Sequence, residues 1–105
     1  MQVEFKNPKL KKICEDNKRL SKKYGDKQAK EIIKRINELD AAANLYDISK
    51  IPQARLHPLR QNWKGYCSVD VKHPYRIFLL PLNGDLSDIK TITAVKIVNI
   101  HIDPH

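Results

Sequence analysis

Apolar residues recur with a helical period in the first half of this chain and with a two-residue period in the second half. Within residues 26–39, one stripe at helical spacing consists of Ala29, Ile32, Ile33, Ile36 and Leu39. The residues off this stripe include Lys27, Lys30, Lys34 and Arg35. From residue 66 onward, apolar and polar side chains alternate as they do on β-strands. Because each pattern leaves one apolar face to bury, the sequence predicts an α+β fold with helices packed on one face of a sheet.

Capping and turn-forming residues place the helices. Asn7 and Pro8 favour a helix start, because Asn caps free N–H groups and Pro presets φ at the first helical position. Gly25 favours the end of this first helix. Asp26 is expected to cap a second helix, which residues 40–44 end. The two helices are expected to form an antiparallel hairpin packed on the sheet.

The second half of the chain is expected to supply most of the strands. The predicted strands are residues 2–5, 54–59, 66–71, 75–80 and 94–102. The short turns between them favour a mostly antiparallel sheet of four to five strands. Pro58 has no N–H to donate to a neighbouring strand, so its strand should lie at a sheet edge or end just past His57.

Size and charge limit the class of protein. The chain has 105 residues, of which 41% are hydrophobic, so we expect one globular domain over residues 1–105. The net charge is +8, from 20 Lys and Arg against 12 Asp and Glu. Such an imbalance favours a polyanionic partner, and either nucleic acid or an acidic protein would satisfy it.

The two cysteines, Cys14 and Cys67, fall in different predicted elements and form no CxxC motif. We expect them to be free intracellular thiols rather than a disulfide. The chain does not open with a signal peptide, and it has no apolar run long enough to span a membrane. A cytoplasmic protein with no membrane partner is therefore expected.

The strongest candidate for chemistry in the middle of the chain is His57, which has Arg55 and Arg60 on either side. An imidazole, with a reference pKa of about 6.5, can act as an acid or a base at cellular pH. Arginine offers a fixed charge and a bidentate fork to phosphate oxygens. The segment is therefore suited to meeting a phosphate.

The C-terminal segment offers similar chemistry. Three apolar residues of the last strand are expected to be buried against the helices: Val98, Ile100 and Ile102. Their burial would turn His101 and Asp103 to the opposite, open face of the sheet, with His105 two residues further along. Arg76, central in the preceding strand, can face the same way. One concave, positively charged surface could then be shared by His57, Arg60, Arg76, Asp103 and His105.

This set of residues suits metal-independent cleavage of RNA. A base must take the proton of the 2′-hydroxyl, an acid must protonate the leaving 5′-oxygen, and cations must stabilise the charge on the phosphorane. The sequence has no Gly-rich phosphate loop, nucleophile elbow or metal-binding helix motif, which excludes most other enzyme classes. We expect no cofactor.

Each feature also has a plainer interpretation. His57 can be a packing residue at a strand end, and Arg76 can form a structural ion pair with Asp70 or Asp103. The lysine-rich first helix can be a solvated face or a docking site for an acidic partner. Trp63 and Tyr66 are more often core or rim residues than platforms for stacked bases. Four groups could also bind a metal: His57, His101, Asp103 and His105.

Short motifs follow one another through most of the chain: Phe5-Lys6, Leu10-Lys11-Lys12, Leu39-Asp40-Ala41-Ala42, Leu56-His57-Pro58-Leu59-Arg60, Lys64-Gly65-Tyr66, Tyr75-Arg76-Ile77, Asn83-Gly84-Asp85 and Asp103-Pro104-His105. In this order and spacing they resemble the plasmid-maintenance killer proteins, the HigB branch of the RelE/ParE toxin superfamily. The resemblance implies a RelE/ParE-like fold. It also implies a toxin that enters the ribosomal A site and cuts messenger RNA during translation. A helix-turn-helix antitoxin of the HigA type is implied as well, which neutralises the toxin and represses their shared operon through its operator DNA.

The resemblance also implies roles for individual residues. The catalytic group would comprise His57, Arg76, Asp103 and His105. Substrate phosphates and RNA would be bound by Arg55, Arg60 and Lys64. The sequence departs from the family pattern at Pro104, where a tyrosine is usual, and at Cys67, where an aromatic residue is usual. The segment between Asp85 and the last strand is also longer than the short hairpin expected. The alternative functions are a non-catalytic inhibitor of a protein target, as in gyrase-directed ParE relatives, or an operon co-repressor.

Overall fold

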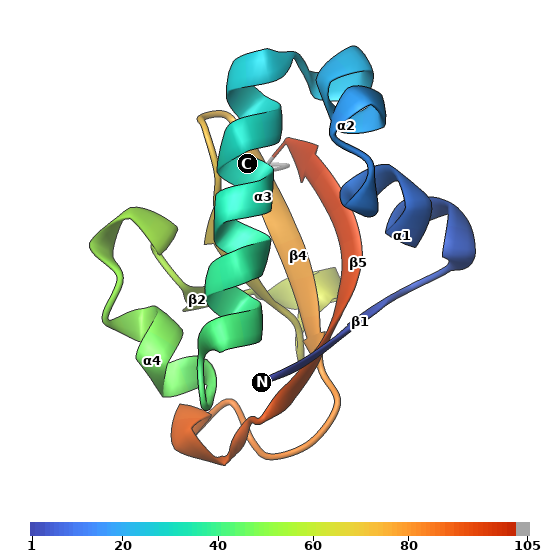
Figure 1. The fold of residues 1–105 in the computed structure, drawn as a ribbon. Coiled ribbons are helices and arrows are strands. Elements are labelled where there is room, and N and C mark those ends of the chain that lie inside the picture. The colour runs from blue at the N-terminus through green and yellow to red at the C-terminus, as the bar shows by residue number, and fades with distance from the viewer. Residues whose placement is uncertain (103–105) are drawn as a thin grey trace.

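The computed structural model describes residues 1–102 and has a five-stranded sheet with helices packed on one face (Figure 1). The strands are β1 (Gln2–Phe5), β2 (His57–Pro58), β3 (Cys67–Asp70), β4 (Tyr75–Pro81) and β5 (Ala94–Ile102). Their order across the sheet is β1-β5-β4-β3-β2. β1 pairs parallel with β5, whereas the other neighbouring pairs are antiparallel. The predicted α+β class is confirmed, and the sheet is mixed.

The helices are α1 (Pro8–Glu15), α2 (Asn17–Tyr24), α3 (Asp26–Ala41) and α4 (Leu45–Ser49). Single 3₁₀ turns follow at η1 (Pro52–Ala54), η2 (Gln61–Trp63) and η3 (Ile89–Thr91). None of the helices between residues 1 and 102 has the length and apolar character needed to cross a membrane. The long α3 crosses the sheet, and α2 packs against α3 (Figure 1).

The predicted single helix from Pro8 to Gly25 is wrong, because the chain leaves helical geometry at Asp16. Asp16 has an extended backbone, with φ −120° and ψ 107°. Its carboxylate accepts hydrogen bonds from the backbone N–H groups of Lys18 and Arg19, at 3.0 and 3.3 Å. Asp16 therefore ends α1 and caps α2, the role that short acidic side chains favour over a mid-helix position.

The start of α1 agrees with the prediction, whereas the start of α3 does not. Oδ1 of Asn7 accepts the N–H of Leu10 at 2.8 Å. Gly25, at φ +89°, ends α2 as expected. Asp26, however, is the first residue of α3 rather than its cap, and no side chain caps this helix among the described residues.

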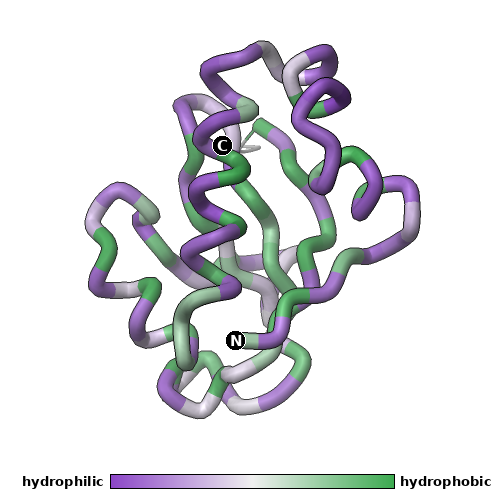
Figure 2. Tube along the Cα trace, viewed as in Figure 1, coloured by the Kyte–Doolittle hydropathy of each residue, from purple (hydrophilic) through white to green (hydrophobic). Residues whose placement is uncertain are grey.

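The core lies between α3 and the sheet. The α3 stripe is confirmed in that Ala29, Ile32 and Leu39 are fully buried. The sheet supplies buried partners from its three central strands: Val69, Ile77, Leu79, Val95 and Ile97. Hydrophobic stretches run along β4 and β5 behind α3, whose own residues alternate in hydropathy (Figure 2). Each fully buried aliphatic side chain stabilises the fold by about 1.5–3 kcal/mol, which fixes α3 on the sheet.

A β-bulge in β5 overturns the expected alternation of that strand. Phe78 pairs with Asn99, but Leu79 pairs with Ile97, so Val98 is an extra residue. Because a bulge inserts one extra residue, the alternation of side chains before the bulge is out of phase with the alternation after it. Val98 therefore lies on the open face, which is the face of the sheet opposite α3, and the prediction that it is buried against the helices is wrong.

Beyond the bulge the side chains face the sides of the sheet that the sequence predicts, but only one of the two predicted core residues there is buried. Ile100 is buried, as expected. Ile102 is 44% exposed, so its predicted burial is also wrong. His101 pairs in register with Arg76, which places both on the open face.

The strand predicted at residues 54–59 is much shorter in the structure. Arg55 has a left-handed backbone, with φ 42° and ψ 52°, which interrupts the extended chain before β2. Only His57 and Pro58 pair with β3, and β2 is an edge strand of the sheet. The edge position expected from Pro58 is confirmed.

Candidate active site

His57 and Arg76 lie together on the open face of the sheet. His57 pairs with Ser68 of β3, and Arg76 reaches it from β4. Nη1 of Arg76 is 2.8 Å from Nε2 of His57, and Nη2 is 2.7 Å from Nδ1. Arg76 is 7% exposed, whereas His57 is half-buried. A guanidinium at this distance can act on the same phosphate as the imidazole.

Both ring nitrogens of His57 have polar neighbours. Nδ1 is 3.1 Å from the carbonyl oxygen of Arg55 and 2.7 Å from Nη2 of Arg76, whereas Nε2 is 2.8 Å from Nη1 of Arg76. These contacts hold the ring beside the guanidinium. An imidazole in such a place can serve as a general acid or a general base.

Asp70 also belongs to this site, although the sequence indicated it only as a possible ion-pair partner of Arg76. Its Oδ1 lies 2.8 Å from Nη2 of Arg76, and its Oδ2 lies 3.6 Å from Nη1 of Arg55. The carboxylate is 20% exposed, and the Arg55 side chain is 73% exposed. Arg76 thus forms an ion pair with Asp70, as the plainer interpretation of this arginine predicted. The same ion pair orients the guanidinium of Arg76. The pairing of Asp70 with Arg76 across β3 and β4 follows from the strand register.

Behind the sheet, α3 supports Asp70 through a buried arginine. Arg35 is 2% exposed, and its Nε donates to the carbonyl oxygen of Asp70 at 2.8 Å. Its Nη groups form ion pairs with Glu31, at 3.8 Å, and with Glu38. Arg35 was expected to lie off the buried stripe of α3, and its burial shows that this expectation is wrong. Its burial is tolerated because each end of the guanidinium is paired.

A concavity opens beside this cluster at the end of the sheet. It has a volume of about 350 Å³ and is lined by Arg55, Asp70, His73, Pro74, Tyr75, Arg76 and Ile102. His73 is exposed and borders this concavity. Two arginines at the wall make the concavity suitable for an anionic group.

The remaining predicted site residues are not brought to the cluster. Arg60 and Lys64 are exposed on either side of η2, and neither is a hydrogen-bond partner of His57 within the described part of the chain. Asp103 and His105 lie outside the described residues. The site is therefore built from His57, Arg76 and their neighbours.

Neither cysteine is suited to act as a nucleophile. Cys67, in β3 next to Ser68, is 1% exposed, and burial raises the pKa of its thiol to about 12. Burial likewise raises the pKa of Cys14 to about 11. Both remain protonated near neutral pH, and a thiol is a poor nucleophile. The imidazole of His57, by contrast, lies 2.8 Å from Arg76 and is suited to acid–base chemistry.

A family model described as "RelE-like toxin of type II toxin-antitoxin system HigB" matches residues 3–105. The chain belongs to this HigB-like toxin family. The match spans every element that forms the site, from α3 to β5. A toxin of a type II toxin-antitoxin system has an antitoxin as its partner, so an antitoxin partner is implied for this HigB-like toxin.

Two known proteins illustrate the relationship. The HigB-like toxin is 29% identical over 105 residues to Toxin HigB-1 of Vibrio cholerae serotype O1, covering 100% of this chain and 98% of that protein. It also resembles the solved structure of a YoeB/ParE toxin from Agrobacterium tumefaciens, with a TM-score of 0.53 and 11% identity. That comparison covers 98% of this chain and 99% of the other. The predicted RelE/ParE-like fold is confirmed.

Proposed function

We propose that this HigB-like toxin is a ribosome-dependent, metal-independent endoribonuclease that cuts messenger RNA during translation. The observation that carries the proposal is the contact between Nη1 of Arg76 and Nε2 of His57, at 2.8 Å, beside a concavity that Arg76 lines. Acid–base chemistry and charge stabilisation are thus available at one point on the surface.

The proposed reaction is an internal transfer at phosphorus. The 2′-oxygen of one nucleotide attacks the adjacent phosphorus and loses its proton to a base, while the 5′-oxygen of the next nucleotide leaves and takes a proton from an acid. His57 serves as one of these groups, and His105, outside the described residues, serves as the other. Asp103 would orient a histidine or contact the base. The products are a 2′,3′-cyclic phosphate and a 5′-hydroxyl end.

The arginines supply positive charge where it develops in the transition state. Arg76, held by Asp70, points its fork toward the imidazole, so it can bind a non-bridging phosphate oxygen while His57 moves the proton. Arg55, at the rim of the concavity, and Arg60 and Lys64, further along the surface, would bind RNA phosphates. The net charge of +8 supports a polyanionic substrate.

The proposal includes the partners of such a toxin. Messenger RNA and the ribosome are the targets in the cytoplasm. A HigA-like helix-turn-helix antitoxin would neutralise the toxin and bring it to operator DNA. A small neighbouring gene encoding a helix-turn-helix protein would support this part of the proposal.

The decisive experiment uses two substitutions of the same kind. Arg76→Lys keeps the charge but removes the fork, whereas Arg19→Lys makes the same change at an exposed residue of α2. Cleavage of messenger RNA in a translation reaction is mapped by sequencing the new 5′ ends. Arg76→Lys and His57→Gln should each lower the cleavage rate by about 10²–10⁴-fold, and Arg19→Lys should leave it unchanged.

The same experiment tests the non-catalytic alternative, in which the Arg76–Asp70 pair is structural and the toxin inhibits a protein target. Circular dichroism and thermal melting would first establish that the variants are folded. Transcripts that stay intact after induction of the wild-type toxin, together with DNA-damage signalling, would refute the nuclease proposal. A folded His57→Gln/His105→Gln variant that still arrests growth would refute the residue assignment.

A further inference from the structure

We propose that a groove beside the candidate active site binds the single-stranded RNA that flanks the cleaved phosphate. The inference rests on the proposed nuclease function and extends it to a second surface. The groove, here called the lysine groove, has a volume of about 560 Å³ and is lined by Lys6, Asn7, Lys9, Leu10, Ile13, Lys23, Trp63, Tyr66, Leu80, Lys96, Val98 and Asn99.

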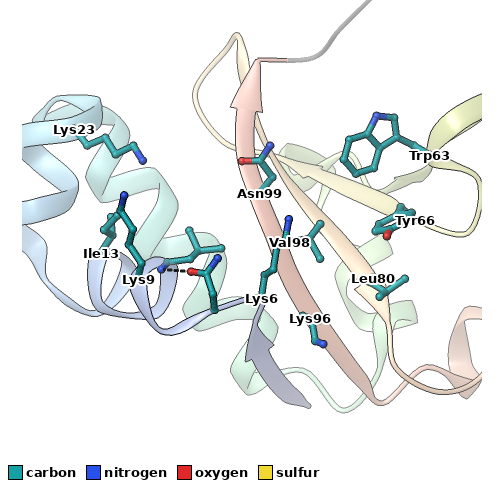
Figure 3. Close-up of a pocket in the computed structure, with 12 residues that line it drawn as sticks. Lys6, Lys9, Ile13, Lys23, Trp63, Tyr66, Leu80, Lys96, Val98 and Asn99 are labelled. Carbon is teal, nitrogen blue, oxygen red and sulfur yellow. Dashed lines mark hydrogen bonds between the residues drawn. The ribbon is translucent and has the colours of Figure 1, made fainter.

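The walls of the lysine groove come from parts of the chain that are far apart in sequence (Figure 3). Lys9 and Lys23, from α1 and α2, stand on one side, and Trp63 and Tyr66 stand on the other. Residues of β5 form the floor between them. The β-bulge is what places Val98 there instead of in the core. The bulge therefore contributes Val98 to the floor of the groove.

The charge of the lysine groove favours an anion. Four lysines line it, no acidic residue is among the lining residues, and none of those lysines is in a salt bridge within residues 1–102. By contrast, the positive charge of Arg76 is already balanced by Asp70. An RNA strand would therefore gain much of its electrostatic attraction here, away from the cleaved bond.

The aromatic side chains of the groove favour nucleic acid over an acidic protein. Trp63 stands edge-to-face with both Tyr66 and Phe78, with ring centroids 5.1 Å apart in each pair. Both Trp63 and Tyr66 are half-buried, so each keeps some surface toward the groove. Lysines interleaved with rigid aromatic rings are the combination that binds phosphates and stacked bases of a single strand.

One row of β4 side chains links the groove to the active site. Arg76, Phe78 and Leu80 follow at alternate positions and face the same side of the sheet. Phe78 contacts Trp63, and Leu80 lines the groove. Arg76 and Leu80 are four residues apart, or about 13 Å along the strand. A strand of RNA whose phosphate lies at Arg76 can therefore extend over this row into the lysine groove.

The test is a binding measurement that does not depend on cleavage. The probe is a short single-stranded RNA with a 2′-deoxy nucleotide at the scissile position, titrated against the full-length wild-type toxin over a series of salt concentrations. Trp63 is the only tryptophan of the chain, so its fluorescence reports on the groove directly. We expect the RNA to quench this fluorescence as it binds.

Two variants with equal charge change provide the comparison. The groove variant is Lys6→Gln/Lys9→Gln/Lys23→Gln/Lys96→Gln, and the control variant replaces four exposed lysines outside the groove: Lys12→Gln/Lys18→Gln/Lys22→Gln/Lys27→Gln. The groove variant should lose at least tenfold more affinity than the control. Its slope of log K against log salt should fall by about 3, since each phosphate contact contributes about 0.7 for a single strand. Thermal melting checks that both variants are folded.

Failure of this inference can be told apart from failure of the nuclease proposal. Equal affinity of the two variants, or no quenching of Trp63 in the wild-type toxin, would overturn the lysine groove even if messenger RNA is still cut. Retention of RNA binding but selective loss of binding to an acidic polypeptide, poly-glutamate, by the groove variant would also overturn it and assign the groove to a protein partner. Selective loss of RNA binding, without any cleavage by the wild type, would support the groove and refute the nuclease.

Discussion

Arg76 and Asp70 face each other across β4 and β3, and Nη2 of the arginine lies 2.8 Å from Oδ1 of the aspartate. The same guanidinium reaches both ring nitrogens of His57. Both members of the ion pair are mostly buried, at 9% and 20% side-chain exposure, so the arginine is held in one orientation before any substrate arrives. Such preorganisation matters for catalysis, because no orientation energy is then required at the transition state.

Asp70→Asn should therefore impair the toxin in a specific way. The amide keeps an oxygen near Arg76 but removes the charge, so we expect a loss of about 1–2 kcal/mol in unfolding free energy and slower cleavage of messenger RNA. Urea unfolding and the translation cleavage reaction measure the two effects. Asp16→Asn, which preserves a helix cap on an exposed surface, is the matched control. A cleavage rate equal to that of the wild type would remove Asp70 from the positioning role.

Arg35→Met should be more damaging to stability than most single substitutions. The change leaves the carbonyl oxygen of Asp70 without its donor and leaves Glu38 beside an apolar side chain. We expect a cost of about 2–4 kcal/mol, because one partner of a buried ionic cluster is removed. The double variant Arg35→Met/Glu38→Leu should recover part of this loss. A double variant less stable than Arg35→Met would show that Glu38 does not depend on Arg35.

Gly84 is required in the loop before β5 for two reasons. It has a positive φ of +69°, and a Cβ there would collide with the carbonyl group of Thr91. Gly65 has a positive φ of +94° but open space around its missing Cβ. Gly65→Ala should therefore cost only the strain of a left-handed residue, about 1–2 kcal/mol, and Gly84→Ala should cost clearly more. Thermal melting of the two variants compares them, and equal melting temperatures would contradict the clash.

The elements that depend on local chemistry were predictable from the sequence. The N-cap at Asn7, the apolar stripe of α3 and the edge position of Pro58 each rest on residues close together in the chain. The break at Asp16 is also local, but apolar residues at helical spacing on both sides of it favoured one continuous helix. Here the capping preference of Asp outweighed the periodicity.

The features that depend on the partner strand were not predictable. The bulge at Val98 exists only as a mismatch between β4 and β5, so the alternation of β5 alone gave the wrong face. The burial of Arg35 depends on a carbonyl group 35 positions away in the chain. The sequence predicted His57 and Arg76 as site residues and offered Asp70 only as one possible ion-pair partner of Arg76. The strand register pairs Asp70 with Arg76, and the contact of Asp70 with Arg55 was not predicted.

The buried thiol of Cys67 should make the stability of the toxin depend on pH in the alkaline range. Burial raises its pKa to about 12, whereas the pKa of an unfolded thiol is about 8.5. The unfolded state therefore loses its proton first, so the stabilisation is complete below the unfolded pKa and is lost as pH rises toward the folded pKa.

Urea unfolding at a series of pH values checks this expectation. Relative to Cys67→Ala, the wild type should lose about 2 kcal/mol more unfolding free energy between pH 7.5 and pH 10. The difference between the two proteins removes the contribution of lysines and tyrosines, which titrate in both. Iodoacetamide provides an independent measurement, because the thiol should react slowly in the native protein and rapidly in urea at the same pH. Parallel stability curves for the two proteins, or fast native alkylation of Cys67, would show that this thiol is accessible and contributes no pH dependence.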